Sequence, residues 1–123
     1  MKRDFRNIKA WTNADDLVTQ IYSATKDFPK EEIYGVVSQI RRAAVSIPSN
    51  IDEGAARKTA KEYLQFLYIA QGSLSELEYL LYLSKKLGYL KDIGYDKLDD
   101  LRNQTAKTLY GLINYIEKET KAP

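Results

Sequence analysis

Apolar residues recur every three or four positions along most of the chain, and no stretch alternates with a period of two. This spacing is typical of amphipathic helices rather than strands. Four such helices are predicted, over residues of about 8–27, 31–54, 60–87 and 93–119. Because short connections join them, neighbouring helices are expected to run antiparallel. The sequence therefore predicts one all-α domain over residues 1–123, an antiparallel up-down-up-down four-helix bundle.

The third helix has the clearest boundaries in the sequence. Thr59 and Glu62 have the T-x-x-E spacing of a capping box, in which the two residues satisfy free amides at the start of a helix. Gly88 can adopt the left-handed conformation that commonly ends a helix. We therefore expect this helix to begin just after Thr59 and to end just before Gly88.

The second helix contains a proline. Pro48 lacks a backbone donor and crowds the carbonyl of Ala44, which predicts a kink or a break at that point. Asn50 could then cap a restarted helix, and Gly54 could end it. Ser49 or Asn50 can also satisfy backbone groups at the bend. We favour this architectural role for the polar residues over a catalytic one.

The third helix is apolar on more than one side, since Glu76 and Glu78 are the only charged residues between positions 63 and 84. A peripheral helix in a monomeric bundle needs one apolar stripe, and soluble monomers rarely expose the surplus. Self-association through this helix is therefore expected, and tyrosine rings suit an interface. The alternative is a wide core with scattered surface tyrosines. The candidate interface residues are Leu64, Tyr68, Tyr79 and Tyr82.

Composition excludes most familiar enzyme chemistry. The 123 residues contain no cysteine and no histidine, which excludes a disulfide framework, a thiolate zinc site, a Ser-His-Asp triad and a histidine-ligated metal. Adjacent carboxylates such as Asp99 and Asp100 diverge by about 100° on a helix, so they do not share a site. We expect no catalytic centre, no metal and no cofactor. A hydrolase that uses carboxylates or a Ser/Lys pair is the remaining enzymatic alternative.

Basic residues form clusters although the net charge is only +2. Arg41 and Arg42 are the only charged residues in positions 33–51, and arginine suits phosphate because its guanidinium is planar and always charged. A second cluster lies at the start of the third helix, where free amides also attract anions. The alternative is a solvated surface on which Arg41 pairs with a carboxylate. The candidate nucleic-acid contacts are Arg41, Arg42, Arg57, Lys58 and Lys61, and a further basic group is Lys2, Arg3, Arg6 and Lys9.

No targeting or membrane segment is expected. The first residues lack the apolar run of a signal peptide, and no stretch approaches about 18 uninterrupted apolar residues. We therefore expect a bacterial cytoplasmic protein with no membrane partner.

Two longer segments resemble a known family. Residues 41–54 read RRAAVSIPSNIDEG, and residues 63–78 read YLQFLYIAQGSLSELE. Both resemble signatures of the four-helix-bundle proteins encoded by intervening sequences within bacterial 23S rRNA genes. Trp11, residues 28–32 and residues 87–89 are similar too, so the resemblance covers nearly the whole chain.

The resemblance implies an up-down four-helix bundle that commonly assembles as a ring-like homopentamer. Related proteins include the accessory protein of diversity-generating retroelements, which works with a reverse transcriptase and associates with nucleic acid. Carried over to this chain, the resemblance makes Arg41, Arg42, Arg57 and Lys58 candidate phosphate contacts. Five copies would raise a net charge of +2 to about +10 and would repeat each weak contact around a ring.

The expected function is a non-catalytic oligomeric accessory protein that binds structured RNA or DNA through a basic rim formed by these residues. The alternative is a homo-oligomeric scaffold with no nucleic-acid role, whose tyrosine-rich surface recruits a protein partner. The resemblance makes a reverse transcriptase one such partner.

Overall fold

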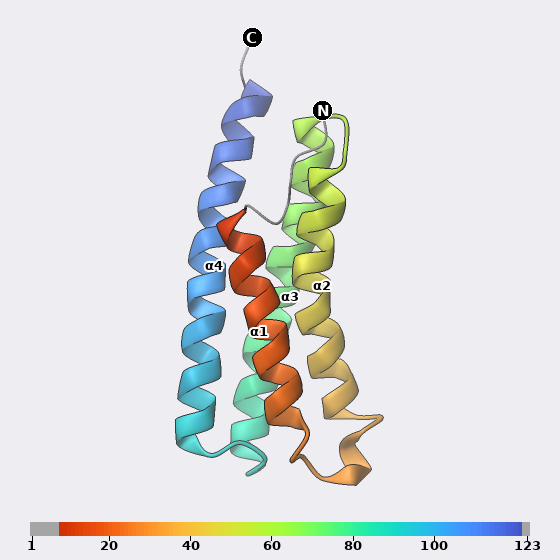
Figure 1. Ribbon diagram of the computed structural model, residues 1–123, viewed down its shortest axis with the longest axis vertical. Helices are drawn as coiled ribbons and strands as arrows, with labels where there is room; N and C mark the ends of the chain where they lie inside the picture. The colour runs from red at the N-terminus through yellow and green to blue at the C-terminus, as the bar shows by residue number, and fades with distance from the viewer. Residues whose placement is uncertain (1–7, 122–123) are drawn as a thin grey trace.

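The computed structural model describes residues 8–121, which fold into four long α-helices (Figure 1). α1 spans Lys9–Thr25, α2 spans Val36–Ala55, α3 spans Ala60–Lys86 and α4 spans Asp92–Lys121, with a short 3₁₀ turn, η2, at Lys30–Glu32. No strand occurs among the described residues. The all-α class predicted from the apolar spacing is confirmed.

Each long helix contacts two of the other three. α2 lies against α3, α3 lies against α4, and α1 lies against both α2 and α4. Within the described part of the chain, the diagonal pairs α1–α3 and α2–α4 make no close backbone contact. Figure 1 shows the α2–α3 connection at one end of the molecule and the other two connections at the opposite end. This closed cycle of neighbours is compatible with a four-helix bundle.

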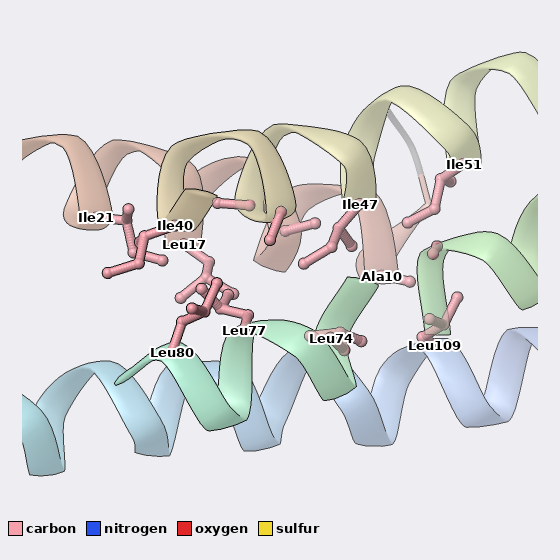
Figure 2. Packing of buried hydrophobic residues seen from close by; sticks show 14 of the residues in the cluster. Ala10, Leu17, Ile21, Ile40, Ile47, Ile51, Leu74, Leu77, Leu80 and Leu109 are labelled. Atoms are coloured by element: carbon pink, nitrogen blue, oxygen red, sulfur yellow. The ribbon is translucent and has the colours of Figure 1, made fainter. Parts of the chain in front are cut away.

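The core fills the space that the four helices enclose, and Figure 2 shows apolar side chains from all four pointing into it. Residues three or four positions apart share one side of a helix, so the apolar stripe of each helix turns inward. Removing this apolar surface from water contributes about 25 cal/mol per Å². The largest fully buried side chains are Leu17, Ile21, Ile40, Ile47, Ile51, Tyr63, Leu67, Leu77, Leu81, Thr105, Leu109 and Ile116.

Both ends of α3 lie where the sequence predicts, although Glu62 accepts from the Thr59 hydroxyl and not from its amide as a full capping box requires. Thr59 Oγ1 accepts a hydrogen bond from the Glu62 backbone N at 3.1 Å, and the Thr59 hydroxyl donates to Glu62 Oε1 at 3.0 Å. At the other end, Gly88 has a φ of +82°, and the Tyr89 amide donates to the carbonyl of Ser84 at 2.8 Å. This is the Schellman arrangement that a glycine in the left-handed conformation allows. The limits of α3 therefore follow from local sequence.

The second helix begins later than predicted, at Val36 rather than near residue 31, and Lys30–Glu32 forms a 3₁₀ turn instead. Glu32 explains the difference. Its Oε1 accepts a hydrogen bond from the Val36 backbone N at 3.4 Å, which places a carboxylate at the positive end of α2. Its Oε2 accepts from the Tyr89 hydroxyl at 2.7 Å, and this hydrogen bond raises the pKa of Tyr89. A contact with the distant α3–α4 connection thus helps to set the start of α2.

α2 continues through Pro48 without interruption, so the predicted alternative of a break and a new helix start at Asn50 is wrong. The Asn50 side-chain amide instead donates to the Ser46 carbonyl at 2.7 Å and to Ser46 Oγ at 3.0 Å. The Ser73 hydroxyl of α3 donates to the same Ser46 Oγ at 2.8 Å. The two Asn50 bonds lie within α2, next to Pro48, which lacks a backbone donor, and the Ser73 bond ties α2 to α3.

Gly54 does not end α2 in a left-handed conformation, because the helix runs on to Ala55 and Gly54 is buried inside it. A Cβ added at Gly54 would lie 2.7 Å from Tyr63 Cδ1 and 3.0 Å from Phe66 Cβ. The glycine therefore lets α2 and α3 approach each other closely just before the chain turns between them.

Candidate nucleic-acid interface

The five basic residues predicted to contact nucleic acid form two separate groups. Arg41 and Arg42 lie in the second turn of α2, whereas Arg57 and Lys58 lie in the α2–α3 connection and Lys61 lies in the first turn of α3. At a rise of 1.5 Å per helical residue, the two groups are roughly 20 Å apart. The structure therefore does not bring the predicted set to one point.

Of the further basic group, Lys9 is an exposed residue at the start of α1. Lys2, Arg3 and Arg6 lie outside the described residues. The candidate interface is built from α2, the connections at its two ends and α3, with Tyr22 of α1 at one edge.

The Arg41 side chain is half-buried and is fixed by two contacts with α1. Its Nε donates a hydrogen bond to Thr25 Oγ1 at 2.9 Å, and its guanidinium carbon lies 4.5 Å from the centre of the Tyr22 ring. Among the described residues it forms no ion pair with a carboxylate. A guanidinium held in this way keeps N–H donors for an anion and has little conformational freedom left to lose on binding.

Arg41 and Arg42 line a groove of about 840 Å³, which we call the arginine groove. It runs across α2 from Tyr22 of α1 to Glu76 of α3, and Tyr34 lies in the connection that leads into α2. Arg42 is exposed, and the Tyr34 side chain is 96% exposed. The other residues that line it are Ile33, Val37, Ser38, Gln39, Ala43, Val45, Ser46 and Ser73.

The second group, Arg57, Lys58 and Lys61, which we call the junction cluster, is exposed to solvent. The Arg57 guanidinium carbon lies 4.6 Å from the centre of the Phe66 ring. The amides at the start of α3 attract anions less than predicted, because Thr59 already accepts from one of them and Glu62 adds a negative charge beside them. Phosphate contacts in such a setting are weak individually, as exposed charge pairs are.

The side of α3 predicted to self-associate is only partly exposed. Leu64 is 7% exposed and belongs to the subunit's own core, so its assignment to an interface is corrected. Tyr79 and Tyr82 are 59% and 51% exposed. Tyr68 is exposed as well, and its hydroxyl donates to Glu117 Oε2 of α4 at 2.9 Å, which raises the pKa of Tyr68. Leu80 is also buried, so a wide core accounts for part of the apolar surplus of α3.

Sequence reasoning missed the two tyrosines of the arginine groove. Tyr22 lies 19 positions before Arg41 in the sequence, so no local spacing connects them. Tyr34 stands in a connection, where helical periodicity carries no information. The one available signal was the adjacent pair Ile33 and Tyr34, two large apolar residues in the first turn of the predicted helix that bears two arginines.

Sequence reasoning also missed a buried arginine between α3 and α4. Arg102 is 8% exposed, its Nε donates to Asp99 Oδ1 at 2.8 Å, and its Nη2 lies 3.3 Å from Glu78 Oε2. The Glu78 contact joins α4 to α3, whereas Asp99 lies on α4 itself. With two carboxylates beside it, Arg102 is no candidate for phosphate.

The fold and the groove define an all-α protein whose second helix presents two arginines in one groove, Arg41 fixed against the Tyr22 ring and Arg42 exposed. Over the described residues, no helix combines the length and apolar character needed to cross a bilayer. Residues 6–111 match the family described as 23S rRNA-intervening sequence protein, and the chain belongs to this family.

Among solved structures, the chain is similar to a protein of unknown function from the S23 ribosomal protein family of Bacteroides thetaiotaomicron VPI-5482. The TM-score is 0.79 and the sequence identity is 23%, over 85% of this chain and 95% of that chain. At this identity the likeness shows the fold alone. No curated protein matches the chain.

Proposed function

We propose that this chain is a non-catalytic, oligomeric accessory protein of the cytoplasm that binds structured RNA or DNA. The observation that carries the proposal is the fixed guanidinium of Arg41, which Thr25 and Tyr22 hold in place without a carboxylate partner among the described residues. An unneutralised guanidinium in a groove attracts phosphate, and Arg42 adds a second positive charge beside it. The junction cluster supplies a further contact roughly 20 Å away.

In this proposal the subunit is an antiparallel up-down-up-down bundle whose second helix bends at Pro48. Subunits assemble as a homopentamer through the exposed side of α3, where Tyr79 and Tyr82 supply the aromatic area that interfaces favour. Assembly repeats each weak phosphate contact, which compensates for the low net charge of a single chain. The same proposal includes a relationship between this chain and the retroelement accessory proteins. A reverse transcriptase is then its protein partner.

The direct test is nucleic acid that copurifies with the protein. We expect a raised ratio of absorbance at 260 nm to that at 280 nm, which falls after a high-salt wash because added cations compete for the phosphates. Fluorescence anisotropy measures the binding of a labelled RNA hairpin or DNA duplex. The logarithm of the binding constant should fall linearly with the logarithm of the salt concentration. Four phosphate contacts, from Arg41, Arg42, Arg57 and Lys58, give a slope of about −3.6 for a duplex. Absence of binding at low salt would refute the nucleic-acid proposal.

The exposed tyrosines of α3 favour a second candidate function, a homo-oligomeric scaffold that binds protein and not nucleic acid. Replacing Tyr68, Tyr79 and Tyr82 with serine is expected to convert the oligomer into a 14.1 kDa monomer in light scattering, because these rings would supply the interface. The matched control replaces Tyr110 and Tyr115, which are 61% and 63% exposed on α4. A parent protein that is itself a stable monomer at micromolar concentration contradicts both forms of self-association.

A further inference from the structure

We propose that the arginine groove takes an unpaired nucleotide of a nucleic-acid strand, with its base stacked on Tyr34 and its phosphate bound by Arg42. This inference rests on the nucleic-acid function proposed above and specifies which form of nucleic acid the groove recognises.

Tyr34 is the first observation. Its side chain is 96% exposed, and the neighbouring Ile33 is 51% exposed. Both line the groove, in the connection that leads into α2. An aromatic ring left almost wholly in water gains much from being covered, and a nucleobase covers it well because every base has a flat π-face. Stacking of a base on an aromatic side chain contributes about 1–3 kcal/mol.

The two tyrosines of the groove have different tasks. One face of the Tyr22 ring is occupied by the Arg41 guanidinium at 4.5 Å, so Tyr22 positions the arginine. The Tyr34 ring forms no such contact among the described residues, and it is the ring that remains for a base. Arg42 lies exposed in the same groove. A stacking surface beside a cation is the combination that single-stranded nucleic acids require.

The charge distribution sets the path of the sugar–phosphate backbone through the groove. Glu76 lines the groove on the α3 side, where its carboxylate repels phosphate. Arg41 and Arg42 line it on α2, so the sugar–phosphate backbone passes near them and away from Glu76. Ser38 and Gln39 line the same groove and offer hydrogen-bond donors and acceptors for a base edge.

A duplex fits these features less well than an unpaired nucleotide does. In a duplex each base is stacked on its neighbours, so proteins reach its edges and the backbone but not its π-face. The groove volume of about 840 Å³ lies within the range of roughly 300–1,000 Å³ that is typical of small-ligand sites. The structure thus favours an unpaired loop, bulge or single-stranded end of a structured RNA or DNA.

The test compares Tyr34→Ala and Tyr34→Trp in the full chain with the parent protein. Each binds a labelled single strand and a blunt duplex of equal length, and anisotropy gives both affinities. We expect Tyr34→Ala to weaken single-strand binding about five- to hundredfold while duplex binding stays unchanged. Tyr34→Trp should restore single-strand binding, since indole also stacks. Because the Tyr34 side chain lies almost wholly in water, its loss leaves the core intact.

Tyr115→Ala is the matched control, because this tyrosine is 63% exposed on α4 outside the groove, and we expect it to bind the single strand as the parent does. The inference is wrong if Tyr34→Ala binds the single strand as tightly as the parent does. That result would refute it even if the groove binds another ligand, such as a peptide. In that event, weaker binding of both nucleic acids by Arg42→Glu would leave the proposed function standing. If the parent binds neither nucleic acid, the proposed function fails and this inference fails with it.

Discussion

Replacing Arg41, Arg42, Arg57 and Lys58 with glutamate is expected to abolish nucleic-acid binding even at low salt. Four exposed or half-exposed contacts at roughly 1 kcal/mol each amount to about 4 kcal/mol, which is a loss of about a thousandfold in affinity. Repulsion between the new carboxylates and phosphate adds to this loss. Anisotropy titrations of a labelled RNA hairpin at low salt measure it.

A control variant shows whether binding depends on where the positive charges lie or only on the net charge. Replacing Lys97, Lys107, Lys118 and Lys121 of α4 with glutamate produces the same net charge, and all four lysines are exposed. This variant should bind much more tightly than the first one. Equal losses in the two variants would mean that net charge, and not the two basic groups, determines binding. Since Arg41 also contacts Thr25 and Tyr22, a companion variant that keeps Arg41 shows whether any loss comes from misfolding.

The second large effect is expected from Gly54→Ala. The new methyl group would lie 2.7 Å from a ring carbon of Tyr63, which is 1% exposed and therefore enclosed by its neighbours. α2 and α3 would have to separate near their connection, and such overpacking destabilises a protein by about 1–3 kcal/mol. We expect the melting temperature in a thermal denaturation experiment to fall by roughly 5–15 °C.

Gly111→Ala provides the opposite case in the same protein. Gly111 is an exposed residue of α4, and a Cβ added there has no neighbour within 4 Å. Alanine favours a helix over glycine by about 1 kcal/mol, so this variant should be slightly more stable than the parent. If Gly54→Ala were as stable as Gly111→Ala, the close approach of α2 and α3 at Gly54 would not exist in solution.

The candidate site was predictable in part. The sequence identified Arg41 and Arg42 because two charges in a long uncharged stretch are conspicuous in a helical pattern. It did not show that Thr25 and Tyr22 fix Arg41, or that Tyr34 shares a groove with the arginines. Those contacts join α1, α2 and the connection between them, and residue spacing within one helix carries no information about its neighbours.

The helices and the limits of α3 follow from local sequence, because an apolar stripe, the Thr59 cap and the left-handed Gly88 each act within a few residues. Other features depend on contacts between segments far apart in the chain. Glu32, held by Tyr89, helps to set the start of α2, and Leu64 is buried because neighbouring helices cover it. Gly54, which by its sequence alone looks like the end of a helix, is a glycine because the Tyr63 ring of α3 occupies the space a side chain would need.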